Sequence, residues 1–131
     1  MSEVTQEPAK QGVKGIILFG HGARNPEYVA PFKRIRGVVE AQQPGTPVEI
    51  GFLELTQPPL EAAITCLVSR GVSQIRVVPI FFAPGRHVLK DLPALLGNAI
   101  DRFPGVEFEV AACVGEVDAV IEAMAAHAIA A

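Results

Sequence analysis

Short apolar runs alternate along the chain with segments in which apolar and polar residues recur at a helical period. Four runs have the length and composition of β-strands, at residues 15–20, 48–53, 75–82 and 106–112. The first is continuously apolar, which is typical of a strand covered on both faces. The last alternates apolar and acidic residues, as expected at a half-exposed sheet edge.

The intervals between these runs, and the segment after the last one, predict amphipathic helices, the first around residues 32–39. In the other three, apolar residues recur every three or four positions and so form one stripe per helix. The stripes are Leu60, Ala63, Ile64, Leu67 and Val68; then Leu92, Leu95, Leu96, Ala99 and Phe103; then Val117, Val120, Ile121, Met124, Ala125 and Ala128.

Capping residues and prolines predict where two of these helices begin. Pro58 and Pro59 suit the first turn of the second helix, and Thr56 is its expected cap. Asp91 and Pro93 suit the start of the third helix.

Three other prolines leave boundaries open. Pro26 and Pro31 both suit a first turn but cannot share one unkinked helix, so the first helix has two candidate starts. Pro79 lies inside the third predicted strand, where proline normally marks an edge or a bulge. We retain the strand because the flanking valines and phenylalanines favour it.

Alternation of strand and helix predicts the α/β class, with a parallel sheet, right-handed crossovers and helices on both faces. We expect one domain at residues 14–131 after a flexible polar tail at residues 1–13. The expected arrangement is flavodoxin-like, with four strands in the order 2-1-3-4, which places the first and third strands side by side.

Composition excludes several classes of protein. The chain has 131 residues, of which 50% are hydrophobic and 19% charged, so a disordered protein is excluded. The net charge of −3 and the absence of tryptophan give no sign of a nucleic-acid surface. No apolar stretch is long enough to span a membrane or to act as a signal peptide. Cys66 and Cys113 lack metal-binding spacing and are expected to be buried, reduced thiols, so we predict a cytoplasmic location.

Ligand-type side chains follow the first three strands. His21, Glu54 and His87 are separated by 33 residues each, so successive strand–helix units deliver them to the carboxyl edge of the sheet, where open parallel sheets bind ligands. Two imidazoles and a carboxylate suit a divalent transition metal. The same imidazoles can act as bases near neutral pH. The alternative for each residue is an ordinary solvated loop position.

Glycines and cations accompany these candidates. Gly20 and Gly22 flank His21, which indicates that a ligand or another strand passes close to the backbone. The basic residues near these histidines could form a positive patch that faces an anionic ligand. The alternative is that they only keep the protein soluble. The candidate substrate-binding residues are Arg24, Arg86, Lys90, Gly20, Gly22 and Gly85.

Three segments together resemble a known family. LFGHGARNP at residues 18–26, FLEL at 52–55 and VVPIFFAPGRHVLKDLP at 77–93 resemble, in order and spacing, the motifs of the CbiX/SirB-type sirohydrochlorin chelatases, the class II chelatases. The resemblance covers about residues 14–127, and the family also tolerates a proline at position 79. This sequence departs from the family pattern at Ala23, where the family commonly has serine.

The resemblance implies ATP-independent insertion of Co²⁺, Fe²⁺ or Ni²⁺, with cobalt favoured, into sirohydrochlorin in cobalamin or sirohaem-type tetrapyrrole biosynthesis. It assigns His21 and His87 to metal binding and proton removal and places Glu54 near the metal. The metal would be a substrate, with no permanent cofactor, and the cations would pair with the carboxylates of the macrocycle. Absence of a P-loop agrees with independence from ATP.

The resemblance also bears on assembly. Longer members contain two such halves in tandem, so we expect a homodimer whose two rims, carrying His21 and His87, face each other. The competing hypotheses are a non-catalytic metal-binding or metal-delivery protein and a histidine phosphatase. The phosphatase is disfavoured because Gly20, and not arginine, precedes His21.

Overall fold

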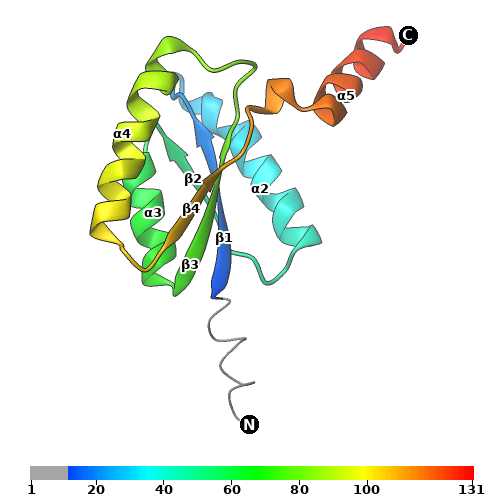
Figure 1. The fold of residues 1–131 in the computed structure, drawn as a ribbon. Helices are drawn as coiled ribbons and strands as arrows, with labels where there is room; N and C mark the ends of the chain where they lie inside the picture. Colours follow the sequence, from blue (N-terminus) through cyan, green and yellow to red (C-terminus); the bar gives the residue numbers. More distant parts are fainter. Residues whose placement is uncertain (1–11) are drawn as a thin grey trace.

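The four predicted strands form one parallel sheet. A computed structural model describes residues 12–131, except for the side chains of residues 87–90. The strands are β1 (Val13–Gly20), β2 (Val48–Phe52), β3 (Val72–Pro79) and β4 (Glu107–Val110). They are ordered β2-β1-β3-β4 (Figure 1), which confirms the predicted fold class and strand order.

Helices cover both faces of the sheet, as predicted. The helix α2 (Ala30–Gln42) lies on one face, and α3 (Leu60–Ser69) and α4 (Arg86–Arg102) lie on the other (Figure 1). Because alternate side chains of a strand point to opposite faces, β1 contributes to both layers. Leu18 packs with Phe32 of α2, whereas Ile17 and Phe19 belong to the core shared with α3 and α4.

Parallel pairing brings the carboxyl ends of the strands to one edge. We call the loops that follow the four strands at this edge the carboxyl rim, which comprises residues 21–25, 53–59, 80–85 and 111–113. Since β1 lies between β2 and β3, its loop is flanked by the loops of both neighbours. The topology therefore places the three candidate ligand segments on one edge.

The ambiguity between two prolines is resolved because each begins its own helix. Pro26 lies in the first turn of the 3₁₀ helix η1 (Pro26–Val29), and Pro31 lies in the first turn of α2. The side chain of Asn25 caps η1 by accepting a hydrogen bond of 2.9 Å from the Glu27 amide. Neither proline therefore interrupts a helix.

Pro79 fits at the end of a central strand. The Ile80 amide donates to the Phe19 carbonyl of β1 at 2.8 Å, so the preceding nitrogen, which belongs to Pro79, faces the β4 side. Pairing with β4 has already ended there, at Val77 opposite Val110. The Ala111 amide still donates to the Val77 carbonyl at 2.9 Å, so the missing N–H ends the pairing with β4 and leaves the pairing with β1 intact.

Two predicted helix starts are wrong. α4 begins at Arg86, with Gly85 at the N-cap, so Pro93 lies inside the helix and not in its first turn. Packing of Leu92 and Leu96 into the core offsets the backbone hydrogen bond that this proline cannot make. Thr56 does not cap α3, whose N-cap is Pro59, because its hydroxyl is bonded elsewhere.

The last helix also departs from expectation. α5 (Asp118–Ile129) follows the short 3₁₀ helix η2 (Val114–Glu116) and has no buried residue. It projects away from the sheet (Figure 1), so its apolar stripe does not join the core of its own chain.

Other predictions fall on the termini and the cysteines. Residues 1–11 of the predicted tail lie outside the described residues, and β1 already begins at Val13. Within residues 12–131, no helix is long and apolar enough to cross a membrane. Cys66 and Cys113 are both free, but only Cys113 is buried as predicted, whereas Cys66 is partly exposed at the surface of α3. Partial burial raises the pKa of each thiol.

Candidate metal centre at the carboxyl rim

The loops after β1 and β2 continue side by side beyond the sheet. The Leu53 amide donates to the Gly20 carbonyl and the Glu54 amide donates to the His21 carbonyl, both at 3.0 Å. Two backbone hydrogen bonds therefore join the two loops beyond the last paired residues of the strands, Gly20 and Phe52. They fix the backbone of both loops before any ligand is present.

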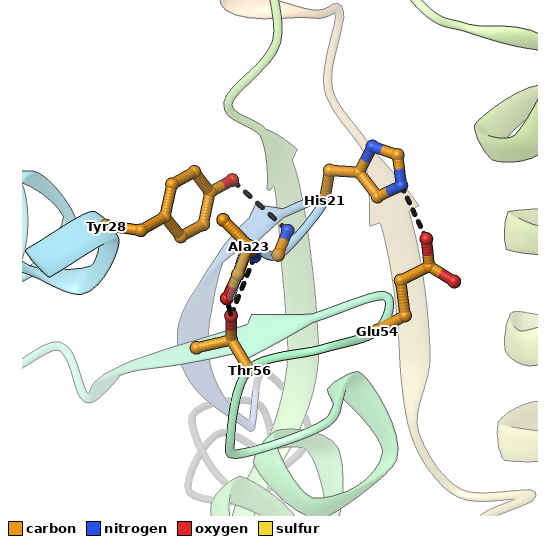
Figure 2. A network of polar contacts seen from close by, with 6 residues as sticks. His21, Ala23, Tyr28, Glu54 and Thr56 are labelled. Carbon is orange, nitrogen blue, oxygen red and sulfur yellow. Dashed lines mark hydrogen bonds and ion pairs between the residues drawn. The ribbon is translucent and has the colours of Figure 1, made fainter. Parts of the chain in front are cut away.

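These hydrogen bonds bring His21 and Glu54 together. Nε2 of His21 lies 3.0 Å from Oε2 of Glu54 (Figure 2), with the side chains 45% and 50% exposed. A carboxylate only accepts, so Nε2 of His21 is the donor in this contact. Such a pair orients an imidazole to bind a metal or to take a proton.

The glycines beside His21 are explained by contacts within the chain. A Cβ on Gly22, whose φ is +106°, would lie 1.6 Å from the Glu54 carbonyl oxygen. A Cβ on Gly20 would lie 2.4 Å from the Phe32 ring. Of the two possibilities raised by the sequence, the passing group at Gly22 is the neighbouring loop. Gly85, by contrast, borders open space.

Two hydroxyl groups, which the sequence analysis did not assign to the site, brace the histidine loop. The Thr56 hydroxyl accepts from the Ala23 amide at 2.9 Å and donates to the Ala23 carbonyl at 2.8 Å (Figure 2). The Tyr28 hydroxyl accepts from the Gly22 amide at 3.2 Å. Ala23 and Thr56 have the same 33-residue separation as His21 and Glu54, so the spacing itself was a usable signal.

The loop after β2 contains a strained residue. Leu55 has φ of +67°, in the left-handed region that side chains normally avoid, and the flanking residues close a tight turn through the Thr56 amide and the Glu54 carbonyl at 2.8 Å. The turn at Leu55 directs the side chain on one side of it, Glu54, toward His21 and the side chain on the other side, Thr56, toward Ala23. Leu55 itself is 58% exposed.

The other candidates reach the rim from β1 and β3. His87 lies in the first turn of α4, and not in a loop as predicted, and its helix follows the strand that neighbours β1. Arg24 and Arg86 are exposed at the ends of the same two connections. The side chains of His87 and Lys90 lie outside the described residues, so the contact shown within the predicted ligand set is that of His21 with Glu54.

A sizeable hollow lies away from the rim. A space of about 700 Å³ is lined by Lys14, Gln43, Gln74, Arg76 and Glu107 among others, at the end of the sheet opposite the rim. Among the side chains described, which exclude that of His87, no group of three potential metal ligands occurs. Among the described side chains, the rim therefore presents a partly assembled site, the pair formed by His21 and Glu54.

The fold and this rim define a class of protein: a small doubly wound α/β unit that holds a histidine–carboxylate pair at the carboxyl edge of its sheet. The chain belongs to the CbiX family, whose family model matches residues 15–131.

Curated relatives share the family. The sirohydrochlorin cobaltochelatase of Methanopyrus kandleri is 38% identical over 82 residues, and that of Saccharolobus solfataricus is 36% identical over 103 residues. These matches cover 63% and 73% of this chain, and 57% and 77% of the two relatives. The matched region thus spans little more than half of the Methanopyrus protein.

Solved structures show the same fold. The CbiX protein from Marinobacter aquaeolei VT8 superposes with a TM-score of 0.76 at 27% identity, covering 88% of this chain and 93% of that one. The sirohydrochlorin chelatase SirB from Bacillus subtilis, in complex with cobalt, also gives 0.76 at 25% identity. The match covers 88% of this chain but only 50% of SirB, so the unit occurs within a chain of about twice its length.

Proposed function

We propose that this chain is an ATP-independent chelatase that inserts a divalent metal into sirohydrochlorin. The observation that carries the proposal is the contact between His21 and Glu54 at the rim of a CbiX-family fold. Co²⁺ is the favoured metal and cobalamin biosynthesis the favoured pathway, supported by relatives named cobaltochelatases. Fe²⁺ and Ni²⁺ remain alternatives because histidine and carboxylate do not select among these ions by ligand type.

His21 has the central role. Glu54 accepts from Nε2 and orients the imidazole, which would hold a partly dehydrated metal ion or accept a pyrrole proton. We assign His87 as the second imidazole, since insertion must remove two pyrrole protons while the ring replaces water on the metal. The metal is a substrate in this scheme, and no permanent cofactor takes part.

The substrate is a flat macrocycle rimmed by carboxylates. Arg24 and Arg86 are exposed where they would meet these carboxylates, and Lys90 follows on α4. Leu55 and Phe82 are 58% and 75% exposed on the rim and would contact the apolar ring. No described side chain lies within 4 Å of a Cβ position at Gly85, on the same rim. The combination suits a ligand with an apolar centre and an anionic edge.

We also propose a cytoplasmic homodimer with facing rims. The rim is open, so one copy alone covers only one side of a macrocycle. A second copy would supply the other wall, as the second half of a double-length chain such as SirB would. The two free thiols suit a reducing compartment.

The test is insertion measured by absorption. Purified protein with sirohydrochlorin and Co²⁺, without ATP, should shift the spectrum of the macrocycle faster than a protein-free sample, and competition among Co²⁺, Fe²⁺ and Ni²⁺ should rank the metals. His21→Ala and His87→Ala should each lower the initial rate about a hundredfold, the lower range for a proton-transfer group. Equal rates with and without protein for all three metals would refute the enzyme, and metal binding without insertion would favour a delivery protein.

A further inference from the structure

Two large apolar side chains are exposed on the carboxyl rim, one on each side of the His21 loop. Leu55 lies in the loop after β2 and is 58% exposed, and Phe82 lies in the loop after β3 and is 75% exposed. Because β1 lies between β2 and β3, the loop of His21 runs between the two. A single exposed apolar residue is ordinary, so each of them needs a further observation before it indicates a ligand.

For Leu55 the further observation is its backbone conformation. Its φ is +67°, and the Thr56 amide donates to the Glu54 carbonyl at 2.8 Å across it, which closes a turn of three residues. A positive φ brings the Cβ of most residues against the backbone, whereas glycine and asparagine adopt it at lower cost. Leucine is therefore an unfavourable residue for this position.

The fold does not require a leucine there. Leu55 belongs to neither of the two core clusters of the described residues. The contacts of Glu54 and Thr56 with the histidine loop depend on the turn of the backbone, which glycine or asparagine would form with less strain. Leucine thus adds both strain and exposed apolar surface to the chain. Strained residues are concentrated at functional sites, where the strain is part of the function.

For Phe82 the further observation is the rigidity of its loop. The preceding residue, Phe81, packs edge-to-face on Phe19, with the ring centroids 5.7 Å apart. The Gly115 amide of η2 donates to the Phe81 carbonyl at 2.9 Å, and a Cβ on Gly115 would lie 2.0 Å from the Phe82 carbonyl oxygen. The exposed ring of Phe82 is therefore carried by a backbone that is held from two sides.

We propose that Leu55 and Phe82 are specificity-determining residues that together seat the apolar face of the macrocycle at the rim. A flat ligand that contacts both side chains spans the loop of His21, which lies between them. The inference rests on the proposed function and adds to it the property that selects the substrate, an extended apolar face. Leucine occupies a strained position because its side chain is part of this seat.

Ionic strength separates this apolar contact from charge attraction. Burial of apolar surface acts by removing that surface from water, so dilute salt hardly weakens it, whereas attraction to Arg24 and Arg86 is screened. Loss of the Leu55 or the Phe82 contact should therefore weaken binding by the same factor at low and at moderate salt. We expect about a tenfold change for each, which is within what burial of a side chain of this size provides.

Binding of metal-free sirohydrochlorin, measured by equilibrium dialysis on the full-length chain, tests the seat apart from insertion. Leu55→Asn should raise the Kd about tenfold at 20 mM and at 200 mM salt alike. Leu55→Met keeps an apolar side chain at the same φ and should bind as the wild type does. Urea denaturation should show Leu55→Asn to be at least as stable as the wild type, because asparagine tolerates the positive φ.

Phe82 is tested in the same way. Phe82→Ala should raise the Kd about tenfold, whereas Phe82→Tyr keeps the aromatic ring and should remain close to the wild type. The matched control is Val38→Ala, which shortens a 56% exposed apolar residue of α2, away from the rim, and should leave the Kd unchanged.

Several results would overturn the seat. An unchanged Kd in Leu55→Asn and Phe82→Ala would show that these side chains do not contact the macrocycle. An equal loss in Leu55→Met would attribute the effect to the turn, and a less stable Leu55→Asn would show that the fold itself needs the leucine. A change of mass in light scattering together with weaker binding would make the two residues a contact between copies.

Failure of the seat and failure of the proposed function give different results. A wild-type protein that binds sirohydrochlorin through Leu55 and Phe82 but inserts no metal would refute the chelatase and support the seat. A protein that inserts metal with an unchanged Kd in these variants would support the chelatase and refute the seat.

Discussion

At the scale of single residues, the site depends on how the loop of His21 is held. Its backbone is hydrogen-bonded to the neighbouring loop. The hydroxyl of Tyr28 also bonds the backbone of Gly22, and the hydroxyl of Thr56 bonds the backbone of Ala23. Each of these contacts restrains the imidazole without touching a metal. Positioning residues of this kind change rates through geometry, since small displacements of a reacting group are costly.

Thr56 gives a matched test of this bracing. Thr56→Val keeps the shape but removes the hydroxyl, leaving both backbone groups of Ala23 without their partner, whereas Thr56→Ser retains the hydroxyl. We expect Thr56→Val to lower the insertion rate about tenfold and the stability by about 1–3 kcal/mol. Thr56→Ser should restore most of both. Equal rates in the two variants would show that the hydroxyl does not position the loop.

Substitutions of Glu54 test whether this residue orients the His21 ring or binds the metal itself. In Glu54→Gln, the amide oxygen can still accept from Nε2 of His21 but has no charge, whereas Glu54→Ala loses the contact. If Glu54 acts by orienting the ring, Glu54→Gln should keep much of the insertion rate and Glu54→Ala should lose about tenfold or more. Equally severe losses in both variants would contradict the orienting role and indicate that the charge itself is needed.

At the scale of elements, parallel pairing determines which loops meet. β1 and β2 pair residues 32 apart up to Gly20 opposite Phe52, and in the loops beyond them residues 33 apart come together. Gly22 is the point where this close approach leaves no room for a side chain. The same chain contains a glycine in an unconstrained helix, which allows a direct comparison.

Gly22→Ala and Gly37→Ala should therefore have opposite effects on the free energy of unfolding. At Gly22 a methyl group meets the Glu54 carbonyl at a positive φ, so we expect a loss of about 1–3 kcal/mol together with loss of insertion. Gly37 lies within α2 with nothing near its Cβ position, so alanine should stabilise by about 0.5–1 kcal/mol. Chemical denaturation measures both. If Gly22→Ala left the free energy of unfolding unchanged, the loop would have moved to make room for the methyl group.

At the scale of the whole molecule, charge is unevenly distributed. The chain carries a net charge of −3, yet arginines stand at the rim connections after β1 and β3. A macrocycle rimmed by carboxylates would be attracted to the rim by this local charge, against the net charge. Attraction between exposed charges weakens as salt increases.

Salt dependence tests this attraction. The KM for sirohydrochlorin should rise with ionic strength, and Arg24→Gln/Arg86→Gln should raise KM at low salt and flatten its dependence on salt. Lys33→Gln/Arg34→Gln removes the same charge from the exposed surface of α2 and serves as the control. The same response in both double variants would attribute the effect to net charge and not to the rim.

The sequence by itself determined the elements and the edge at which they deliver ligand-type side chains. Strand and helix periods follow from local burial, so the class and the loops that carry His21, Glu54 and His87 were predictable. The strand order was expected because it brings the loops of the two histidines together. The sequence also predicted free cysteines. These features can be inferred from the order and residue pattern of short segments of the chain.

Only the tertiary structure decided how these pieces touch. It placed Thr56 on Ala23 instead of at a helix cap, and it began α4 before Pro93, because packing and long-range hydrogen bonds outweighed local preferences. It also left the stripe of α5 exposed, although its period is that of a core helix. An apolar stripe specifies that a helix must be covered, but the partner that covers it is decided by what the rest of the fold leaves open.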